Sequence, residues 1–259
     1  MEAVIFAGGL GSRLSEETLS VPKPMIQIGN QPLIWHIMKI YSHYGINNFI
    51  VCCGYKSEQI KEYFLNYLYA NSDLTISLNG EKVEVKVHKA PLENWTVTLV
   101  DTGLNTMTAG RLKSVEPYIK SENFCLTYGD GVADININEL LKHHEHAKKM
   151  VTITAIRPKG RFGALILKDD LVTSFKEKIS NDTDYINGGF FVLNKKVFNA
   201  LRTIDSNEPW EGQPIQDLVQ NDEVTAFRHN GFWQSMDTLK EKNFLNEIWN
   251  EGKAPWKIW

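Results

Sequence analysis

The feature that most constrains the fold is a short apolar segment followed by clustered glycines near the start of the chain. Residues 3–7 (AVIFA) form an apolar run typical of a buried strand. Three glycines follow within four positions, at Gly8, Gly9 and Gly11. Because glycine has no Cβ, backbone N–H groups in such a turn can approach an anion closely. The segment therefore predicts a strand that ends in an anion-binding loop.

Two cations lie close to this loop in the sequence. Arg13 follows the glycines directly and offers a planar fork of donors. Lys23 stands between Pro22 and Pro24, which restrict the backbone on both sides. A strand end, a run of amides, an arginine and a restrained lysine together predict a polyphosphate-binding site. The simpler alternative is a glycine-rich turn that only joins a strand to a helix.

Two common phosphate-binding motifs do not fit this segment. The P-loop string G-x-x-x-x-G-K-[ST] does not occur in the chain. The dinucleotide fingerprint G-x-G-x-x-G begins at Gly9 and Gly11, but Leu14 occupies the third glycine position. The next strong helical pattern begins only near Pro32, so the helix that should follow a dinucleotide loop at once is missing.

Composition excludes several classes of function. A chain of 259 residues can bury the core of one large α/β domain. Its net charge of −3 provides no basic surface for nucleic acid or anionic membranes. The apolar runs are strand-sized, the first residues lack the features of a signal peptide, and three cysteines do not make a disulfide framework. We therefore expect a cytoplasmic protein that binds neither nucleic acid nor membrane.

The periodicity of apolar residues predicts an α/β fold. Residues 32–44 have helical spacing, residues 49–54 read as a buried strand, and residues 57–69 as a second helix capped by Ser57 or its neighbour. This alternation predicts a mainly parallel central sheet with helices on both faces. Ligands bind such sheets beyond the carboxyl ends of the strands, where the glycine loop is expected to lie.

A β-hairpin is predicted to interrupt the alternation. Residues 74–87 read as two strands joined by Asn79-Gly80, a strong signal for a two-residue turn. That turn would pair Ile76 with Val83 and would give the hairpin one apolar face. A lone hairpin is marginally stable in water, so we expect this face to cover the parent domain or another subunit.

Two carboxylates are predicted at strand ends. Asp130 stands between two glycines after the apolar residues 124–128, and Asp237 follows residues 231–236 near the C-terminus. Mg²⁺ takes oxygen ligands and typically links one or two carboxylates to substrate phosphates, so both residues are candidate ligands. The alternative is an aspartate that only organises a turn.

Two further segments carry candidate binding residues. Glu177 and Lys178 form an acid–base pair after the strand-like residues 172–176. Asn187 precedes Gly188 and Gly189 in residues 185–193, a spacing that suits backbone lying against a flat polar ring such as a sugar.

Taken together, these segments resemble the sugar-phosphate nucleotidyltransferases over nearly the whole chain. Within that family the resemblance is to the cytidylyl branch, because residues 102–111 replace the usual Gln-Pro run. One departure is Ile179, where the family commonly has proline after the Glu-Lys pair. The matching motifs are Gly8-Gly9-Leu10-Gly11-Ser12-Arg13-Leu14, Pro22-Lys23-Pro24-Met25, Val100-Asp101-Thr102-Gly103, Gly110-Arg111-Leu112-Lys113, Tyr128-Gly129-Asp130-Gly131, Ile186-Asn187-Gly188-Gly189 and Met236-Asp237-Thr238-Leu239.

The resemblance implies a single Rossmann-like nucleotidyltransferase domain over residues 1–259. It divides into a nucleotide-binding half of about 1–135 and a sugar-phosphate half of about 136–259, with a β insertion near 72–95. It also implies that CTP and α-D-glucose 1-phosphate react, with Mg²⁺ as cofactor, to give CDP-glucose and pyrophosphate. Homo-oligomers, hexamers among them, and a role in lipopolysaccharide O-antigen biosynthesis belong to the same expectation.

Roles for individual residues follow from the same resemblance. Arg13 and the loop amides would hold the leaving pyrophosphate, and Lys23 would face the α-phosphate. Asp130 and Asp237 would bind Mg²⁺, and Lys178 would orient the glucose phosphate. Contacts with the sugar are expected from Glu177, Lys178, Asn187 and Gly188, and contacts with the nucleotide from Gly8, Gly9, Leu10, Gly11, Ser12, Arg13, Lys23, Thr106, Arg111 and Gly129.

Three alternatives stay open from sequence. A thymidylyl- or uridylyltransferase would share the phosphate chemistry and differ in base recognition. A non-catalytic nucleotide-sugar-binding subunit would bind without turnover, although Lys23, Asp130 and Asp237 favour catalysis. A nicotinamide oxidoreductase would need an acidic residue after the second strand, where Cys53-Gly54-Tyr55 stands instead.

Overall fold

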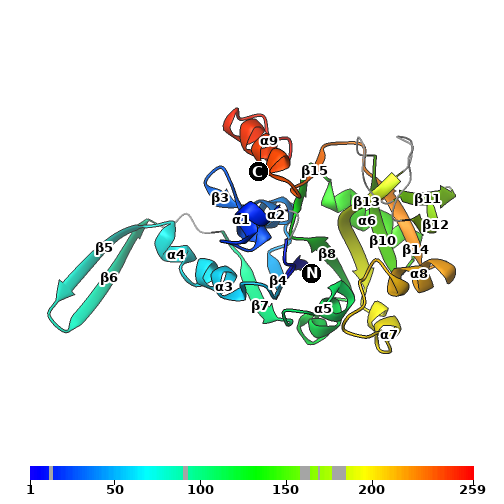
Figure 1. Cartoon of the computed structure of the whole chain (residues 1–259), viewed down its shortest axis with the longest axis horizontal. Coiled ribbons are helices and arrows are strands. Elements are labelled where there is room, and N and C mark those ends of the chain that lie inside the picture. The colour runs from blue at the N-terminus through cyan, green and yellow to red at the C-terminus, as the bar shows by residue number, and fades with distance from the viewer. Residues whose placement is uncertain (12–13, 90–92, 158–163, 169, 177–184) are drawn as a thin grey trace.

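A large mixed sheet forms the centre of the computed structural model, which describes residues 1–11, 14–89, 93–157, 164–168, 170–176 and 185–259 (Figure 1). In this part of the chain the sheet has nine strands in the order β10-β14-β12-β11-β13-β8-β1-β4-β7. They are β1 (Glu2–Ala7), β4 (Asn48–Cys53), β7 (Thr96–Asp101), β8 (Asn123–Tyr128), β10 (Val151–Ile156), β11 (Ala164–Lys168), β12 (Leu171–Lys176), β13 (Tyr185–Asn194) and β14 (Val224–Arg228).

Parallel pairing dominates the half of the sheet that carries the glycine loop. β1 pairs in parallel with β4 and with β8, and β4 pairs in parallel with β7. β13 then joins β8 in antiparallel fashion, and it also pairs with β10 and β11. Because β1, β4 and β8 run in one direction, their carboxyl ends meet at one edge. The expected α/β class and Rossmann-like central sheet are confirmed.

Helices cover both faces of the sheet, also as expected. One face packs against α2 (Leu33–His43), α6 (Ile137–Ala147) and α9 (Leu239–Asn250), and the other against α5 (Thr108–Ser114), α7 (Val197–Leu201) and α8 (Gln213–Gln220). Side chains of strand β1 pack in both cores: Ala3, Ile5 and Ala7 lie in one, and Val4 and Phe6 in the other. No helix among the described residues is long and apolar enough to cross a bilayer.

Short elements connect these layers. They are α1 (Ser15–Thr18), the 3₁₀ turns Lys23–Met25 and Glu116–Tyr118, the strand pair β2 (Gln27–Ile28) and β3 (Gln31–Pro32), and the pair β9 (Gly131–Ala133) and β15 (Trp233–Ser235).

The predicted helix over 57–69 is in fact two helices, α3 (Ser57–Leu65) and α4 (Tyr67–Ala70), on either side of Asn66. The N-cap of α3 is the neighbour of Ser57, Lys56, which has a left-handed conformation and makes no side-chain cap hydrogen bond.

The hairpin exists, but its predicted register is wrong by two residues. Strands β5 (Asp73–Asn79) and β6 (Lys82–Lys89) pair Ile76 with Val85 rather than with Val83. The turn lies at Gly80-Glu81, with Gly80 at φ +63°. A shift of two keeps the same residues on one face. That face is exposed, and the hairpin extends away from the body of the molecule (Figure 1).

The C-terminal tail is held on helix α2 by a buried histidine. The His36 ring has no exposed surface, and its Nε2 lies 2.9 Å from the carbonyl oxygen of Ile28. Since a carbonyl only accepts, Nε2 carries the proton and Nδ1 accepts from Trp256 Nε1 at 3.4 Å. Trp249 stacks edge-on against the same ring, with centroids 4.5 Å apart. The neutral form of His36 therefore holds this contact.

Burial lowers the pKa of His36 to about 4, against an ordinary value near 6.5. Between these pH values the unfolded chain binds more protons, so the free energy of unfolding falls as the pH drops from about 6.5 toward 4. His36 alone contributes a loss of about 3 kcal/mol across that range. Urea unfolding at several pH values checks this, and His36→Phe should give a shallower pH dependence. An unchanged slope in that variant would contradict the assignment.

Candidate functional site

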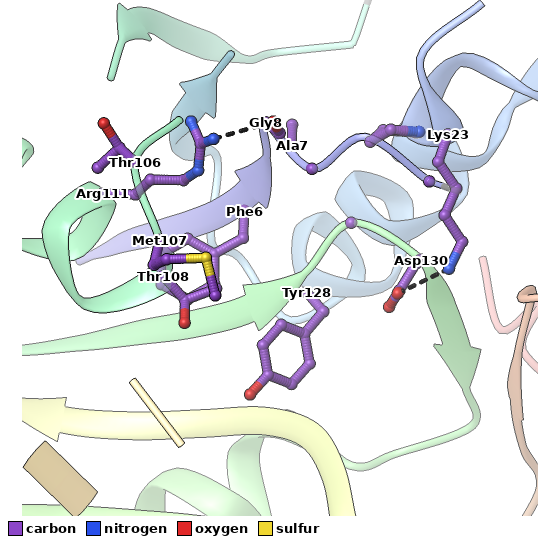
Figure 2. A pocket seen from close by; sticks show the side chains of 14 residues that line it. Phe6, Ala7, Gly8, Lys23, Thr106, Met107, Thr108, Arg111, Tyr128 and Asp130 are labelled. Carbon is purple, nitrogen blue, oxygen red and sulfur yellow. Dashed lines mark hydrogen bonds and ion pairs between the residues drawn. The ribbon is translucent and has the colours of Figure 1, made fainter. Parts of the chain in front are cut away.

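The glycine loop lines a pocket of about 290 Å³ at the carboxyl edge of β1 and β8 (Figure 2). Gly9 is exposed and open: a Cβ added there would meet nothing within 4 Å. Gly11 has φ +64°, and Thr18 closes the turn by donating its hydroxyl to the carbonyl oxygens of Gly11, at 3.1 Å, and Leu14, at 3.0 Å. The backbone of the loop is thus held in shape while part of it faces the pocket.

Arg111 explains why Gly8 must be glycine. A Cβ at Gly8 would lie 2.1 Å from Arg111 Nη1, so only glycine lets the guanidinium approach. Arg111 is buried and donates to Thr102 Oγ1 at 2.6 Å and to the carbonyl oxygens of Gly8, Cys53, Gly103 and Leu104 at 2.9–3.3 Å. Burial lowers the pKa of this guanidinium. The predicted nucleotide contact is therefore a cation that ties the glycine loop to the loop before α5.

Lys23 joins the two predicted metal ligands. Its Nζ lies 2.9 Å from Asp130 Oδ2 and 2.7 Å from Asp237 Oδ1, and the side chain is 11% exposed. Burial lowers the pKa of the ammonium, but the two carboxylates outweigh this effect, and the pKa is raised. Figure 2 shows the Lys23–Asp130 pair beside the pocket. Lys23 therefore points to the carboxylates in this structure.

Local structure brings the two aspartates together. Strand β15 pairs with β9, and Met236 N donates to Asp130 O at 2.8 Å. Thr238 and Glu241 form a capping box at the start of α9, and Glu241 Oε2 also accepts from Asp237 N at 2.7 Å. These contacts fix the direction in which Asp237 leaves its strand.

Oxygen atoms from both aspartates converge on one cation, so this donor set could also hold one divalent metal ion. Mg²⁺ is commonly bound by one or two carboxylates together with water and substrate phosphates. Among the described residues no group of three or more His, Cys, Asp or Glu side chains gathers around a metal position. The pair therefore fits a metal whose remaining ligands come from substrate and water.

The predicted sugar contacts Asn187 and Gly188 bond to neighbouring residues in this structure. Asn187 Nδ2 donates to the Tyr128 hydroxyl at 3.2 Å, and its Oδ1 accepts from Gly189 N at 2.8 Å. The ring of Tyr128 lies against Gly189, where a Cβ would meet it at 2.6 Å. The carbonyl of Gly188 accepts from Trp233 Nε1 at 2.7 Å. Gly189 thus makes room for Tyr128.

The remaining predicted residues divide into two groups. Thr106 and Gly129 line the pocket, and Leu10 is 57% exposed in the loop. Ser12, Arg13, Glu177 and Lys178, together with Ile179, lie outside the described residues. Reasoning from sequence missed Met107, Thr108 and Tyr128, which also line the pocket. Tyr128 could have been found, because it directly precedes the Gly-Asp-Gly turn at a strand end.

Comparison with known proteins gives a match over most of the chain. Residues 2–246 match the family model "Nucleotidyl transferase". The chain is 52% identical over 260 residues to a protein of Salmonella typhimurium named glucose-1-phosphate cytidylyltransferase, and the match covers 100% of both chains.

Solved structures show the same fold at lower identity. The crystal structure of HddC from Yersinia pseudotuberculosis superposes with a TM-score of 0.77 at 21% identity, covering 96% of this chain and 99% of that one. The inositol-1-phosphate CTP transferase of T. maritima superposes with a TM-score of 0.74 at 18% identity, covering 99% of this chain and 96% of that one.

Arg111→Lys should destabilise the protein, because an ammonium cannot reach the oxygens that the guanidinium fork bridges. Leaving buried carbonyls unpaired should lower the free energy of unfolding by about 2 kcal/mol. Urea unfolding measures this, with Lys113→Met as a control on the same helix, since Lys113 donates to exposed carbonyls. Equal stability of Arg111→Lys and the wild type would show that the fork is dispensable.

Proposed function

The chain belongs to the nucleotidyl transferase family, and from this premise we propose that it transfers the cytidylyl group of CTP to glucose 1-phosphate. The products are CDP-glucose and pyrophosphate. The observation that carries the proposal is the 52% identity to a glucose-1-phosphate cytidylyltransferase over 100% of both chains. The pocket supports it, because a glycine loop, a lysine and a carboxylate line one hollow at the carboxyl edge of the sheet.

The reaction needs no side-chain base. The second pKa of a sugar phosphate lies near ~6, as in phosphorylated side chains, so at neutral pH the phosphate oxygen is already an ionised nucleophile. It attacks the α-phosphorus of CTP, and pyrophosphate leaves. Alignment of the two substrates and neutralisation of phosphate charge then provide the catalysis.

The binding groups divide between the nucleotide and the sugar phosphate. The amides of Gly8, Gly9, Leu10 and Gly11, with Ser12 and Arg13, bind the phosphates of CTP, and the loop around Thr106 with Gly129 binds the nucleoside. Lys178 orients the glucose phosphate, and Glu177, Asn187 and Gly188 contact the sugar. Residues of about 1–135 and 136–259 thus form the two halves of a single domain.

Asp130 and Asp237 are the residues that would hold Mg²⁺ in the working enzyme. The ion would neutralise the phosphate oxygens on which charge develops. Lys23 now occupies the position between the two carboxylates, with contacts of 2.9 and 2.7 Å. Lys23 would leave the two carboxylates when they hold the ion, and its ammonium would then face the α-phosphate. Lys23 and the ion would thus exchange places at the carboxylates.

The first test is the choice of nucleotide. Cytosine presents an amino donor where uracil and thymine present a carbonyl, and a site built for one leaves a buried group unpaired with the other. We expect CTP to exceed UTP, dTTP and GTP by at least about tenfold in kcat/KM, measured as pyrophosphate release with glucose 1-phosphate. UTP or dTTP matching CTP would favour the uridylyl or thymidylyl alternative. Binding of CTP without turnover would favour a non-catalytic subunit.

Removing the lysine tests the exchange. Lys23→Met should bind Mn²⁺, a spectroscopic substitute for Mg²⁺, at least about tenfold more tightly than the wild type when no nucleotide is present, because no ammonium competes. Electron paramagnetic resonance of free Mn²⁺ gives both affinities. Lys242→Met is the control, since Lys242 pairs with Glu17 at 2.5 Å and not with the two aspartates. If Lys242→Met also bound Mn²⁺ about tenfold more tightly, the effect would come from the change in net charge and not from the loss of competition by Lys23.

The exposed hairpin supports self-assembly. Ile76, Leu78, Val83 and Val85 are 44–75% exposed on one face, although apolar faces of this kind are normally covered. We expect this face to bury itself in a homo-oligomer, for which hexamers are one form. The tail tryptophan Trp256 is fully buried within its own chain and is not available for that contact.

Light scattering of the wild type and of a Leu78→Glu, Val83→Glu variant tests the assembly. The charges should reduce the mass toward that of a monomer, because two carboxylates on the apolar face oppose its burial. The single change Thr75→Glu, on the opposite face of the hairpin, is the matched control. A wild type that is a stable monomer at micromolar concentration would exclude the proposal.

A further inference from the structure

Glu211 lies beside the pocket but is part of no motif. Its side chain is half-buried, and it takes part in no ion pair among the described residues. Two hydroxyls of pocket residues bond to it instead. Tyr128 donates to Oε1, and Thr108 Oγ1 donates to Oε2 at 2.9 Å. One carboxylate therefore joins the end of β8 to the start of α5.

The Glu211 carboxylate fixes which hydroxyls of this network donate. An ionised carboxylate only accepts, so both hydroxyls must donate their protons to Glu211. The Tyr128 oxygen is then left as an acceptor, which Asn187 Nδ2 approaches at 3.2 Å. Asn187 Oδ1 is turned to Gly189 N at 2.8 Å. On the other side, Thr108 Oγ1 accepts from Trp210 N at 2.7 Å.

Packing holds both ends of the network in place. The Tyr128 ring lies over Gly189 and has Phe191 as an edge-on neighbour, with centroids 5.7 Å apart. The segment that carries Glu211 is anchored by Trp210, which is fully buried. Two backbone hydrogen bonds join this segment to the start of α5. Ser206 O accepts from Met107 N at 2.9 Å, and Glu208 O accepts from Ala109 N at 3.2 Å. The carboxylate is thus aimed by the fold at Tyr128 and Thr108.

We propose that Glu211 is a positioning residue for the sugar-phosphate subsite. By accepting from Tyr128 it keeps the phenol oxygen an acceptor for Asn187 Nδ2, the donor that Gly189 N orients through Asn187 Oδ1. It thereby sets the polarity that a hydroxyl-rich sugar ring meets. The inference rests on the proposed function, since it takes Asn187 as a contact for glucose 1-phosphate.

Glu211→Gln tests the polarity without changing the size of the side chain. The amide can present N–H where the carboxylate accepts, so the direction of the Tyr128 hydroxyl is no longer imposed. The KM for glucose 1-phosphate should rise about tenfold, the scale of one lost charge-assisted hydrogen bond. The KM for CTP and the kcat should change less than about threefold, because Glu211 makes no hydrogen bond to the described residues of the glycine loop or to Lys23.

Tyr128→Phe removes the hydroxyl but keeps the ring that packs on Gly189. It should reproduce the Glu211→Gln effect, and the double variant should be no worse than Tyr128→Phe, because both changes break one network. Glu208→Gln is the matched control: it is an acid of the same segment, and its side chain makes no hydrogen bond or ion pair within the described residues. It should behave as wild type.

Two outcomes would overturn the inference. An unchanged KM for glucose 1-phosphate in folded Glu211→Gln would show that the carboxylate does not set the subsite. Equal increases in KM for both substrates would indicate a collapsed pocket rather than a positioned sugar site. Wild-type turnover is measured first. If the wild type releases no pyrophosphate from CTP and glucose 1-phosphate, the proposed function fails and the inference fails with it.

Discussion

The contact of one ammonium with two carboxylates unites three distant parts of the chain. Lys23, Asp130 and Asp237 come from the first, middle and last portions of the sequence, and Lys23 Nζ is within 2.9 Å of both acids. Two unpaired carboxylates this close would repel each other, and the Lys23 ammonium offsets that repulsion. Several elements position these three residues. They are the parallel strands β1 and β8, the small β9–β15 pair and the capping box of α9.

A second buried cation organises the other end of the pocket. Arg111 bonds to backbone oxygens rather than to an acid, so its charge is spread over the carbonyl dipoles of Gly8, Cys53 and Gly103. Burial of this charge is tolerated because Nη1 and Nη2 both donate to acceptors. Gly8 and Gly54 leave the space for it, since a Cβ at either would come within 2.5 Å of Nη1. The anion-binding loop is thus shaped partly by a cation behind it.

Much of the fold could be predicted because its signals are local. The apolar runs at residues 3–7 and 124–128 alternate between two cores, and glycine and aspartate at their ends mark the ligand edge. The hairpin register failed for a comparable reason: Asn79-Gly80 and Gly80-Glu81 both suit a tight turn, and both leave the same residues on the apolar face. Nothing in the pattern distinguishes them. The contact of Gly189 with the Tyr128 ring could not be predicted, because Tyr128 lies 61 positions earlier in the chain.

By itself, the sequence determined the α/β class, the phosphate-binding character of the first loop and the kinds of side chain gathered at the strand ends. Each of these depends on periodicity, on glycine freedom or on charge, which neighbouring residues reveal. Only the tertiary structure decided which groups meet: Lys23 with both aspartates, Arg111 with backbone carbonyls, and Glu211 with Tyr128 and Thr108. Such contacts join residues far apart in the chain, and their geometry follows from how strands and helices pack rather than from any local preference.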